Sequence, residues 1–149
     1  MTTSNSNANP HANTFQSHLT RRRLHADHVD TLLRRANHLH PHEQSLLRAA
    51  LHEGTPTAHL AALAGVSPRT IRRRVQRLIL HLTSRRFTCI ERSLDHFTPT
   101  RRRIAIACEL QRLSANQAAA SLGMSVHAVR RQRLAIDAFI EASLRGAAA

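Results

Sequence analysis

The chain repeats itself with a period of 58 residues, and this repeat limits the folds open to it more than any other feature. Residues 24–81 align with residues 82–139 without a gap. The identical pairs are Leu24/Leu82, Arg34/Arg92, His38/His96, Pro41/Pro99, Ala49/Ala107, Ala61/Ala119, Ala62/Ala120, Gly65/Gly123, Ser67/Ser125, Arg72/Arg130 and Arg73/Arg131. Apolar residues also fall in step, as in Val29/Phe87, Leu32/Ile90, Leu39/Phe97, Leu46/Ile104, Val66/Met124, Ile71/Val129 and Leu78/Ile136. We therefore expect one small structural unit to occur twice in tandem.

The repeat and the composition divide the chain into three parts. Residues 1–20 are rich in Ser, Thr and Asn without an apolar core, which predicts a disordered arm. Unit one is predicted at residues 21–82 and unit two at residues 83–149. A unit of roughly 60 residues is near the lower limit for independent folding, so the two units are expected to support each other. No stretch approaches the ~18 apolar residues of a membrane span, and the opening residues lack the apolar core and cleavage pattern of a secretory signal, so neither feature is expected.

Charge indicates the class of partner. The net charge is +13, and all 22 basic residues are arginine. A polyanion is therefore the expected partner. A basic ribosomal protein or an arginine-rich tail would have a similar charge, but 42% apolar residues with only four Gly and five Pro favour a folded chain. Cys89 and Cys108 form no CxxC pair, so neither a disulfide framework nor a zinc knuckle is expected. A reduced, cytoplasmic setting is expected instead.

Each unit is predicted to contain four helices, which makes the fold class all-α. The opening helices, at about 24–38 and 85–96, show helical spacing of apolar residues. Pro41 and Pro99 suit the first turn of the second helices. The apolar stripes of the first two helices are Val29, Leu32, Leu33, Leu46, Leu47, Ala50 and Leu51 in unit one, and Phe87, Ile90, Leu94, Ile104, Ala105, Cys108 and Leu110 in unit two. Gly54 is expected to close the second helix of unit one.

The third and fourth helices of each unit are expected to be joined by a tight turn. The third helix is predicted to start at Thr57 or Ser114 and to end at Gly65 or Gly123, since glycine readily adopts left-handed backbone angles. Serine side chains, Ser67 and Ser125, are expected to cap the fourth helices.

The stretch AHLAALAGVSPRTIRRRVQRL, residues 58–78, has the pattern of a helix-turn-helix. Ala61 is small enough for a helix crossing, Gly65 makes the turn, and Val66 and Ile71 fill the angle between the helices. The fourth helix is predicted to bury Ile71, Val75, Leu78 and Leu82. Arg69, Arg72, Arg73 and Gln76 then lie on its opposite face. Arginine in this position can pair with guanine in the major groove.

In unit two, ANQAAASLGMSVHAVRRQRLAI keeps Ala119, Gly123, Met124 and Val129 at the corresponding positions. Arg133 replaces Val75, so either the helix rotates to bury Leu134 and Ile136, or the arginine stem passes along the edge of the core. The residues predicted to contact DNA are Ser67, Arg69, Arg72, Arg73, Gln76, Arg77, Ser125, His127, Arg130 and Arg131. Unit one is expected to recognise DNA better than unit two.

With its flanks, the segment LHPHEQSLLRAALHEGTPTAHLAALAGVSPRTIRRRVQRLILHL, residues 39–82, resembles region four of bacterial sigma factors. The residues that carry the resemblance are Leu39, Pro41, Glu43, the 46–51 helix, Gly54, Leu60, Ala61, Gly65, Val66, Ser67, Thr70, Ile71 and Leu78. The same core occurs in LuxR-like response-regulator output domains, small repressors and transposase end-binding domains. The resemblance implies double-stranded DNA binding and, as a further partner, RNA polymerase. An aromatic-rich segment for promoter melting is absent, so a sigma-like fold without sigma activity is expected.

The sequence does not favour an enzyme, a cofactor or a metal site. Its nine carboxylates are scattered, and it has neither a phosphate-binding glycine loop nor an HExxH motif. Twelve histidines include His38, His40 and His42 in HLHPH, and His25 with His28, but no acidic or cysteine ligand is fixed beside them. Two arginine runs, 21–23 and 101–103, could contact phosphate or could be solvated helix starts.

The favoured interpretation is a bacterial transcriptional regulator in the cytoplasm, associated with the nucleoid, whose two units bind duplex DNA as a pseudo-dimer. A homodimer is compatible with this scheme but is not required. One alternative is a transposase or recombinase end-binding module or accessory factor. Another is an adaptor that binds RNA polymerase or a sigma factor.

Overall fold

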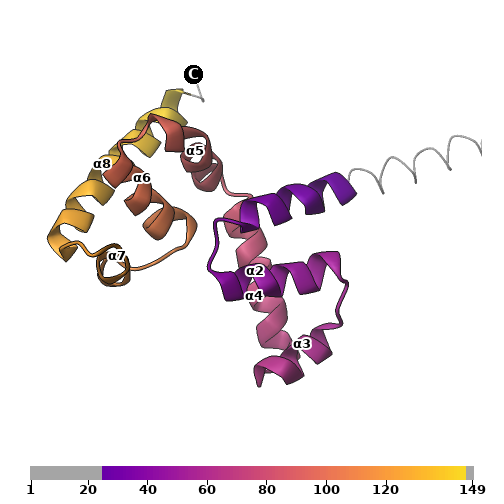
Figure 1. The fold of residues 1–149 in the computed structure, drawn as a ribbon. Coiled ribbons are helices and arrows are strands. Elements are labelled where there is room, and N and C mark those ends of the chain that lie inside the picture. Colours follow the sequence, from indigo (N-terminus) through magenta and orange to yellow (C-terminus); the bar gives the residue numbers. More distant parts are fainter. Residues whose placement is uncertain (1–24, 147–149) are drawn as a thin grey trace, which may run out of the picture.

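The structure is a computed structural model that describes residues 25–146, and within that range it contains helices and turns but no strand (Figure 1). The predicted all-α class is therefore confirmed. The first group of helices consists of a helix over residues 25–36, α2 (Pro41–Leu47), the π-helical turn η1 (Arg48–His52), α3 (Thr57–Ala64) and α4 (Pro68–Leu82). The predicted arm at 1–20 and the arginine run at 21–23 lie outside the described residues.

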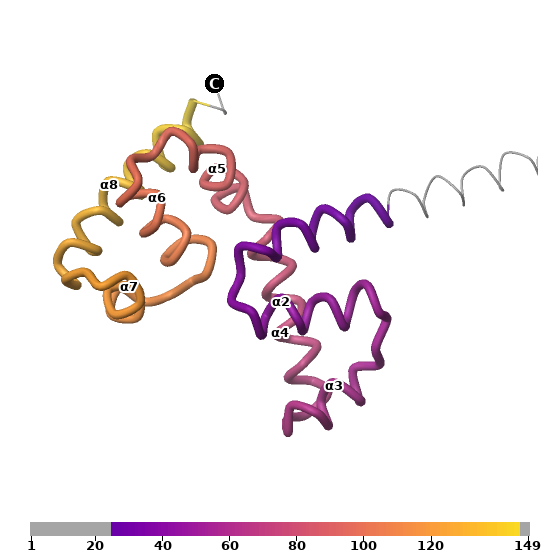
Figure 2. The backbone as a smooth tube through the Cα atoms, in the orientation of Figure 1, coloured from indigo at the N-terminus to yellow at the C-terminus, as the bar shows by residue number. Residues whose placement is uncertain are grey.

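The second group repeats the first. It consists of α5 (Arg85–Ser93), the 3₁₀ turn η2 (Leu94–His96), α6 (Pro99–Ala105), the π-helical turn η3 (Ile106–Leu110), α7 (Ala115–Leu122) and α8 (Val126–Gly146). The bounds of α6, η3 and α7, and the start of α8, are those of α2, η1, α3 and α4 displaced by 58 residues. Figure 2 shows the chain passing from one group to the other where α4 leads into α5.

The helix ends follow from local chemistry at the predicted residues. Pro41, Pro68 and Pro99 occupy first-turn positions, where the missing amide hydrogen costs no helical bond. Gly65 and Gly123 have φ values of 64° and 65° and end α3 and α7. Ser114 and Gln117 form a reciprocal capping box at the start of α7. The starts of α2 and α6 and the ends of α3 and α7 are therefore as predicted.

The hydrophobic core is continuous between the two groups. Leu32, Leu47, Leu78 and Leu82 from the first group belong to the same buried cluster as Phe87 and the interior residues of α6 and α8. Ala61 and Ile71 are also buried, but they lie outside this cluster. The two units thus support each other, as their small size required.

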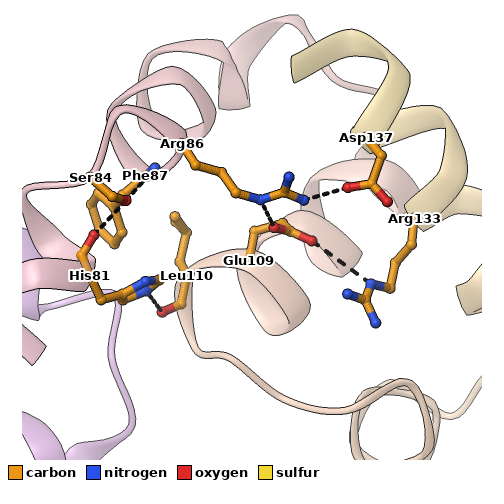
Figure 3. Close-up of polar contacts among 8 residues, drawn as sticks. All are labelled: His81, Ser84, Arg86, Phe87, Glu109, Leu110, Arg133 and Asp137. Atoms are coloured by element: carbon orange, nitrogen blue, oxygen red, sulfur yellow. Dashed lines mark hydrogen bonds and ion pairs between the residues drawn. The ribbon is translucent and has the colours of Figure 1, made fainter. Parts of the chain in front are cut away.

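Polar contacts reinforce this junction. The Arg35 guanidinium donates a hydrogen bond to the Leu82 carbonyl at 2.7 Å, pairs with Glu91 at 3.0 Å and stacks over the Phe87 ring. His81 Nε2 lies 3.0 Å from the Leu110 carbonyl oxygen, and the ring makes an edge contact with Phe87 (Figure 3). Because a carbonyl only accepts, Nε2 of His81 carries the proton, and α4 is tied directly to η3.

This histidine makes stability depend on pH. Burial lowers the pKa of His81 below its usual 6.5, with the nearby Arg112 charge acting in the same direction. Below about pH 6.5 the unfolded chain therefore binds a proton that the folded chain does not, and stability falls as the pH falls. We expect the melting temperature to drop more between pH 7.5 and 5 for the wild type than for His81→Gln, whose amide can still donate to Leu110. Parallel pH profiles for the two proteins would contradict this assignment.

Candidate nucleic-acid interface

α3 and α4 are joined by a turn that local hydrogen bonds hold tightly. After Gly65, the Val66 amide donates to the Ala61 carbonyl at 3.0 Å. Ser67 then caps α4, because its hydroxyl accepts a bond of 3.2 Å from the Thr70 amide. Ala61 and Ile71, where the helices cross, are each 2% exposed. The turn thus fixes the direction in which α4 leaves α3.

The outer face of α4 is basic and exposed. Arg69, Arg72, Arg73, Gln76 and Arg77 are all exposed, as is Ser67 at the cap. Ile71, Leu78 and Leu82 are buried on the opposite face, as predicted, whereas Val75 is only half-buried. The predicted buried and exposed faces of α4 are therefore confirmed except at Val75.

No carboxylate neutralises this face. Between Glu53 and Glu91 the sequence has seven arginines and no acidic residue. Among the described residues, the arginines that form ion pairs are Arg35, Arg86, Arg102, Arg133 and Arg145, none of which belongs to α4. The guanidinium groups of α4 are therefore available to an external anion.

The second unit has the same turn with a weaker basic face. The Met124 amide donates to Ala119 at 3.0 Å, and the Ser125 hydroxyl accepts from the Ala128 amide at 3.1 Å. The predicted residues Ser125, His127, Arg130 and Arg131 are all exposed near the start of α8. Because His127 and Gln132 replace Arg69 and Arg74, α8 presents fewer fixed charges than α4.

The structure distinguishes between the two alternatives for Arg133. Leu134 is 70% exposed, whereas Ile136 is fully buried at the position equivalent to Leu78. The helix has therefore not rotated to bury Leu134, and that alternative is wrong. Instead, Arg133 Nε lies 3.8 Å from the carboxylate of Glu109, whose side chain is only 7% exposed. The arginine stem therefore passes along the edge of the core and places its charge beside a buried acid, without a hydrogen bond between Arg133 Nε and the nearest carboxylate oxygen.

Glu109 is the centre of a four-residue network (Figure 3). Its other oxygen accepts a bond of 2.7 Å from Arg86 Nε, and Arg86 also pairs with Asp137 of α8. These bonds to the two carboxylates raise the pKa of Arg86 above its already high value. The network links α5, η3 and α8, so it fixes the second unit internally.

Sequence reasoning did not identify this network, although the repeat contained a signal. Glu109, Arg133 and Asp137 stand where unit one has Leu51, Val75 and Ile79. Unit two therefore has two acidic residues and one basic residue at positions where unit one has three apolar residues. In unit one, these apolar residues, with Leu60 and Leu80, line an open pocket of about 480 Å³ beside Arg72 and Gln76.

Arg74, which is exposed on α4, was also not among the predicted contacts.

The arginine run at 101–103 is engaged within the protein. Arg101 donates to Gln132 at 3.1 Å, and Arg102 donates to the Leu94 carbonyl at 2.7 Å and pairs with Asp95. Arg103 reaches the Leu122 carbonyl at 3.5 Å. These contacts give the run a role in holding α6 against its neighbours.

The histidines and cysteines do not form a cluster of metal ligands in the described range. His40 Nδ1 and His42 Nδ1 lie 2.7 Å apart, which makes one ring a donor and the other an acceptor. Residues 25–146 contain no group of three or more His, Cys, Asp and Glu side chains arranged to hold a metal ion. Cys89 and Cys108 are free, and burial raises the pKa of the Cys108 thiol, which packs in the core as expected.

Comparison of the chain with protein-family models, with curated proteins and with solved structures gave no match. Within residues 25–146, every helix is either too short or too polar to cross a membrane.

Proposed function

We propose that this protein binds double-stranded DNA through α4 and acts as a transcriptional regulator on the nucleoid. The observation that carries the proposal is the outer face of α4, where Arg69, Arg72, Arg73 and Arg77 are exposed without any carboxylate partner. A solvated structural helix would normally carry charges of both signs. A face of one sign, directly after a rigid capped turn, suits a polyanion.

In this scheme the start of α4 enters the major groove, which is about 12 Å wide and admits a helix. Arg72 and Arg73 contact base edges, since a guanidinium can donate two parallel bonds to guanine O6 and N7. Ser67, Arg69, Gln76 and Arg77 flank them and contact phosphates or neighbouring bases. Arg130 and Arg131, with Ser125 and His127, add a second and weaker contact from α8. The two units would then occupy adjacent sites as a pseudo-dimer.

Salt dependence provides the first test. If six to eight phosphates are neutralised, the plot of log affinity against log salt concentration should have a slope of about −5 to −7. Fluorescence anisotropy with a labelled duplex would measure it, after selection of bound sequences from a random DNA pool. An affinity that does not change with salt would exclude phosphate contacts and with them the proposed function.

A protein-binding adaptor is a second candidate, and the pocket formed by Leu51, Leu60, Val75, Ile79 and Leu80 favours it. Leu80 is 63% exposed, and an apolar opening of this kind suits an apolar side chain of a partner such as RNA polymerase. Replacement of Leu80 with Gln separates the two functions. An adaptor would lose its partner in a pull-down with purified polymerase, whereas affinity for duplex DNA should be unchanged.

A further inference from the structure

A second basic site lies on the flank of α4 that faces unit two. Arg74 and Arg77 of α4 line a cavity of about 280 Å³ together with His42, Glu43 and Arg112, and Leu78 forms part of its floor. Arg112 belongs to unit two, in the turn between η3 and α7. The cavity is therefore built from both halves of the repeat, and Arg77, at the edge of the outer face of α4, belongs to both surfaces.

The charges in this cavity are not balanced internally. Three guanidinium groups face a single carboxylate, that of Glu43. Among the described residues, the side chains of Arg74, Arg77 and Arg112 form neither a hydrogen bond nor an ion pair. Three arginines and one glutamate give the lining a formal charge of +2, which matches a doubly charged anion.

The backbone of Arg112 is an independent indication. Its φ is 60°, and it is the one non-glycine residue of the described range with a positive φ. The equivalent residue in unit one is Gly54, whose φ is 64°. Since left-handed angles are unfavourable for a side chain with a Cβ atom, glycine would suit both positions better. An arginine at a position suited to glycine is consistent with a functional role of its guanidinium group.

We propose that this cavity, formed by Arg74, Arg77, Arg112, His42 and Glu43, binds a phosphoryl group. Arginine matches phosphate oxygens with paired N–H donors, and three arginines line this cavity. The volume lies just below the range of about 300–1,000 Å³ found for sites that enclose a whole small molecule. The site therefore suits one phosphoryl group, either of a free phosphate compound or of a phosphodiester in the DNA backbone.

Binding there would link the two halves of the chain. An anion held between Arg74 and Arg112 connects α4 to the turn before α7. Occupancy of the cavity would restrict the angle between α4 and α8, the two candidate DNA-contacting helices. It would thereby restrict the spacing of the DNA sites that the two helices can contact at the same time. If the phosphoryl group belongs to the DNA backbone, the inference rests on the proposed function. If it belongs to a free phosphate compound, the inference is independent of DNA binding.

Thermal unfolding of the full chain tests the site without DNA. Inorganic phosphate is titrated at constant ionic strength, with chloride as the replaced anion. We expect the wild-type melting temperature to rise by about 4 °C at ten times the dissociation constant. Arg112→Gly and Arg74→Gln should bind at least 10-fold more weakly. Arg112→Gly should fold, since Gly54 serves at the same position in unit one. Arg34→Gln, at an exposed arginine outside the cavity, should respond like the wild type.

The same variants identify the source of the phosphoryl group. General stabilisation by phosphate as a salt affects all variants equally, so only differences between variants count. If the site takes a DNA phosphodiester, Arg112→Gly should make the salt slope of DNA binding shallower by about 1. If it takes a free phosphate compound, the slope should be unchanged while the phosphate-dependent melting shift is lost. Identical behaviour of the wild type, Arg112→Gly and Arg74→Gln in both experiments would overturn the proposal, whatever the outcome for the outer face of α4.

Discussion

Replacing both Arg72 and Arg73 with alanine is expected to weaken binding to the selected duplex by about 2–6 kcal/mol, that is by roughly 30-fold or more, because a bidentate arginine–guanine pair contributes about 1–3 kcal/mol. Both side chains are exposed on α4, so their removal should not disturb the core. Anisotropy titrations at a fixed salt concentration measure the effect. The loss should be larger on the selected sequence than on random DNA, since phosphate contacts are common to both.

The matched control is the double replacement of Arg130 and Arg131, the equivalent residues of unit two. We expect a smaller loss of affinity there, spread evenly over sequences. Circular-dichroism melting curves should show that all variants remain folded. Unchanged DNA affinity of the Arg72/Arg73 variant would exclude α4 as the recognition helix and would favour the adaptor.

Glu109→Gln is expected to have the largest effect on stability. Glu109 is 7% exposed and accepts from Arg86 while it faces Arg133, so its neutralisation leaves two cations without their shared acid. Breaking a buried ion pair costs about 3–5 kcal/mol. Because Arg86 and Arg133 are 44% and 38% exposed and can turn to solvent, we expect about 2–3 kcal/mol here. The melting temperature should fall by roughly 5–10 °C.

The repeat itself supplies the control for this prediction. The triple variant Glu109→Leu, Arg133→Val and Asp137→Ile gives unit two the apolar residues found in unit one. It should be more stable than Glu109→Gln, since the buried acid and the Arg133 beside it are both replaced by apolar residues, and the remaining Arg86, which is 44% exposed, can turn its charge to solvent. Urea unfolding of the three proteins measures the order. A Glu109→Gln variant as stable as the wild type would show that the network contributes only surface electrostatics.

Much of the fold could be predicted because its signals are local. Pro41 and Pro99 start α2 and α6 through their fixed backbone angle, and Gly65 and Gly123 end α3 and α7 through left-handed angles. Ser67 and Ser125 cap the helices that follow. The spacing of apolar residues then gave the buried face of α4, with Val75 as the exception, because in unit one an open pocket lies at this position.

The candidate DNA interface was predictable for the same reason. A helix with a known buried stripe has a known exposed stripe, and this placed Arg69, Arg72 and Arg73 on one face. The network around Arg133 was not predictable, because Glu109 and the Arg86 that shares this acid come from other elements, 24 and 47 positions earlier in the chain. Spacing within one helix carries no information about such contacts.

By itself, the sequence determined the two tandem sets of helices, their boundaries and the exposed basic face of α4, since each depends on residues within a few turns of one another. The tertiary structure decided which charges are paired and which are free. Arg86 is hydrogen-bonded to buried Glu109 and Arg133 lies beside the same acid, whereas Arg74, Arg77 and Arg112 line a cavity between the units. Burial and long-range proximity settle these outcomes, and both arise only when α4, α5, η3 and α8 pack together.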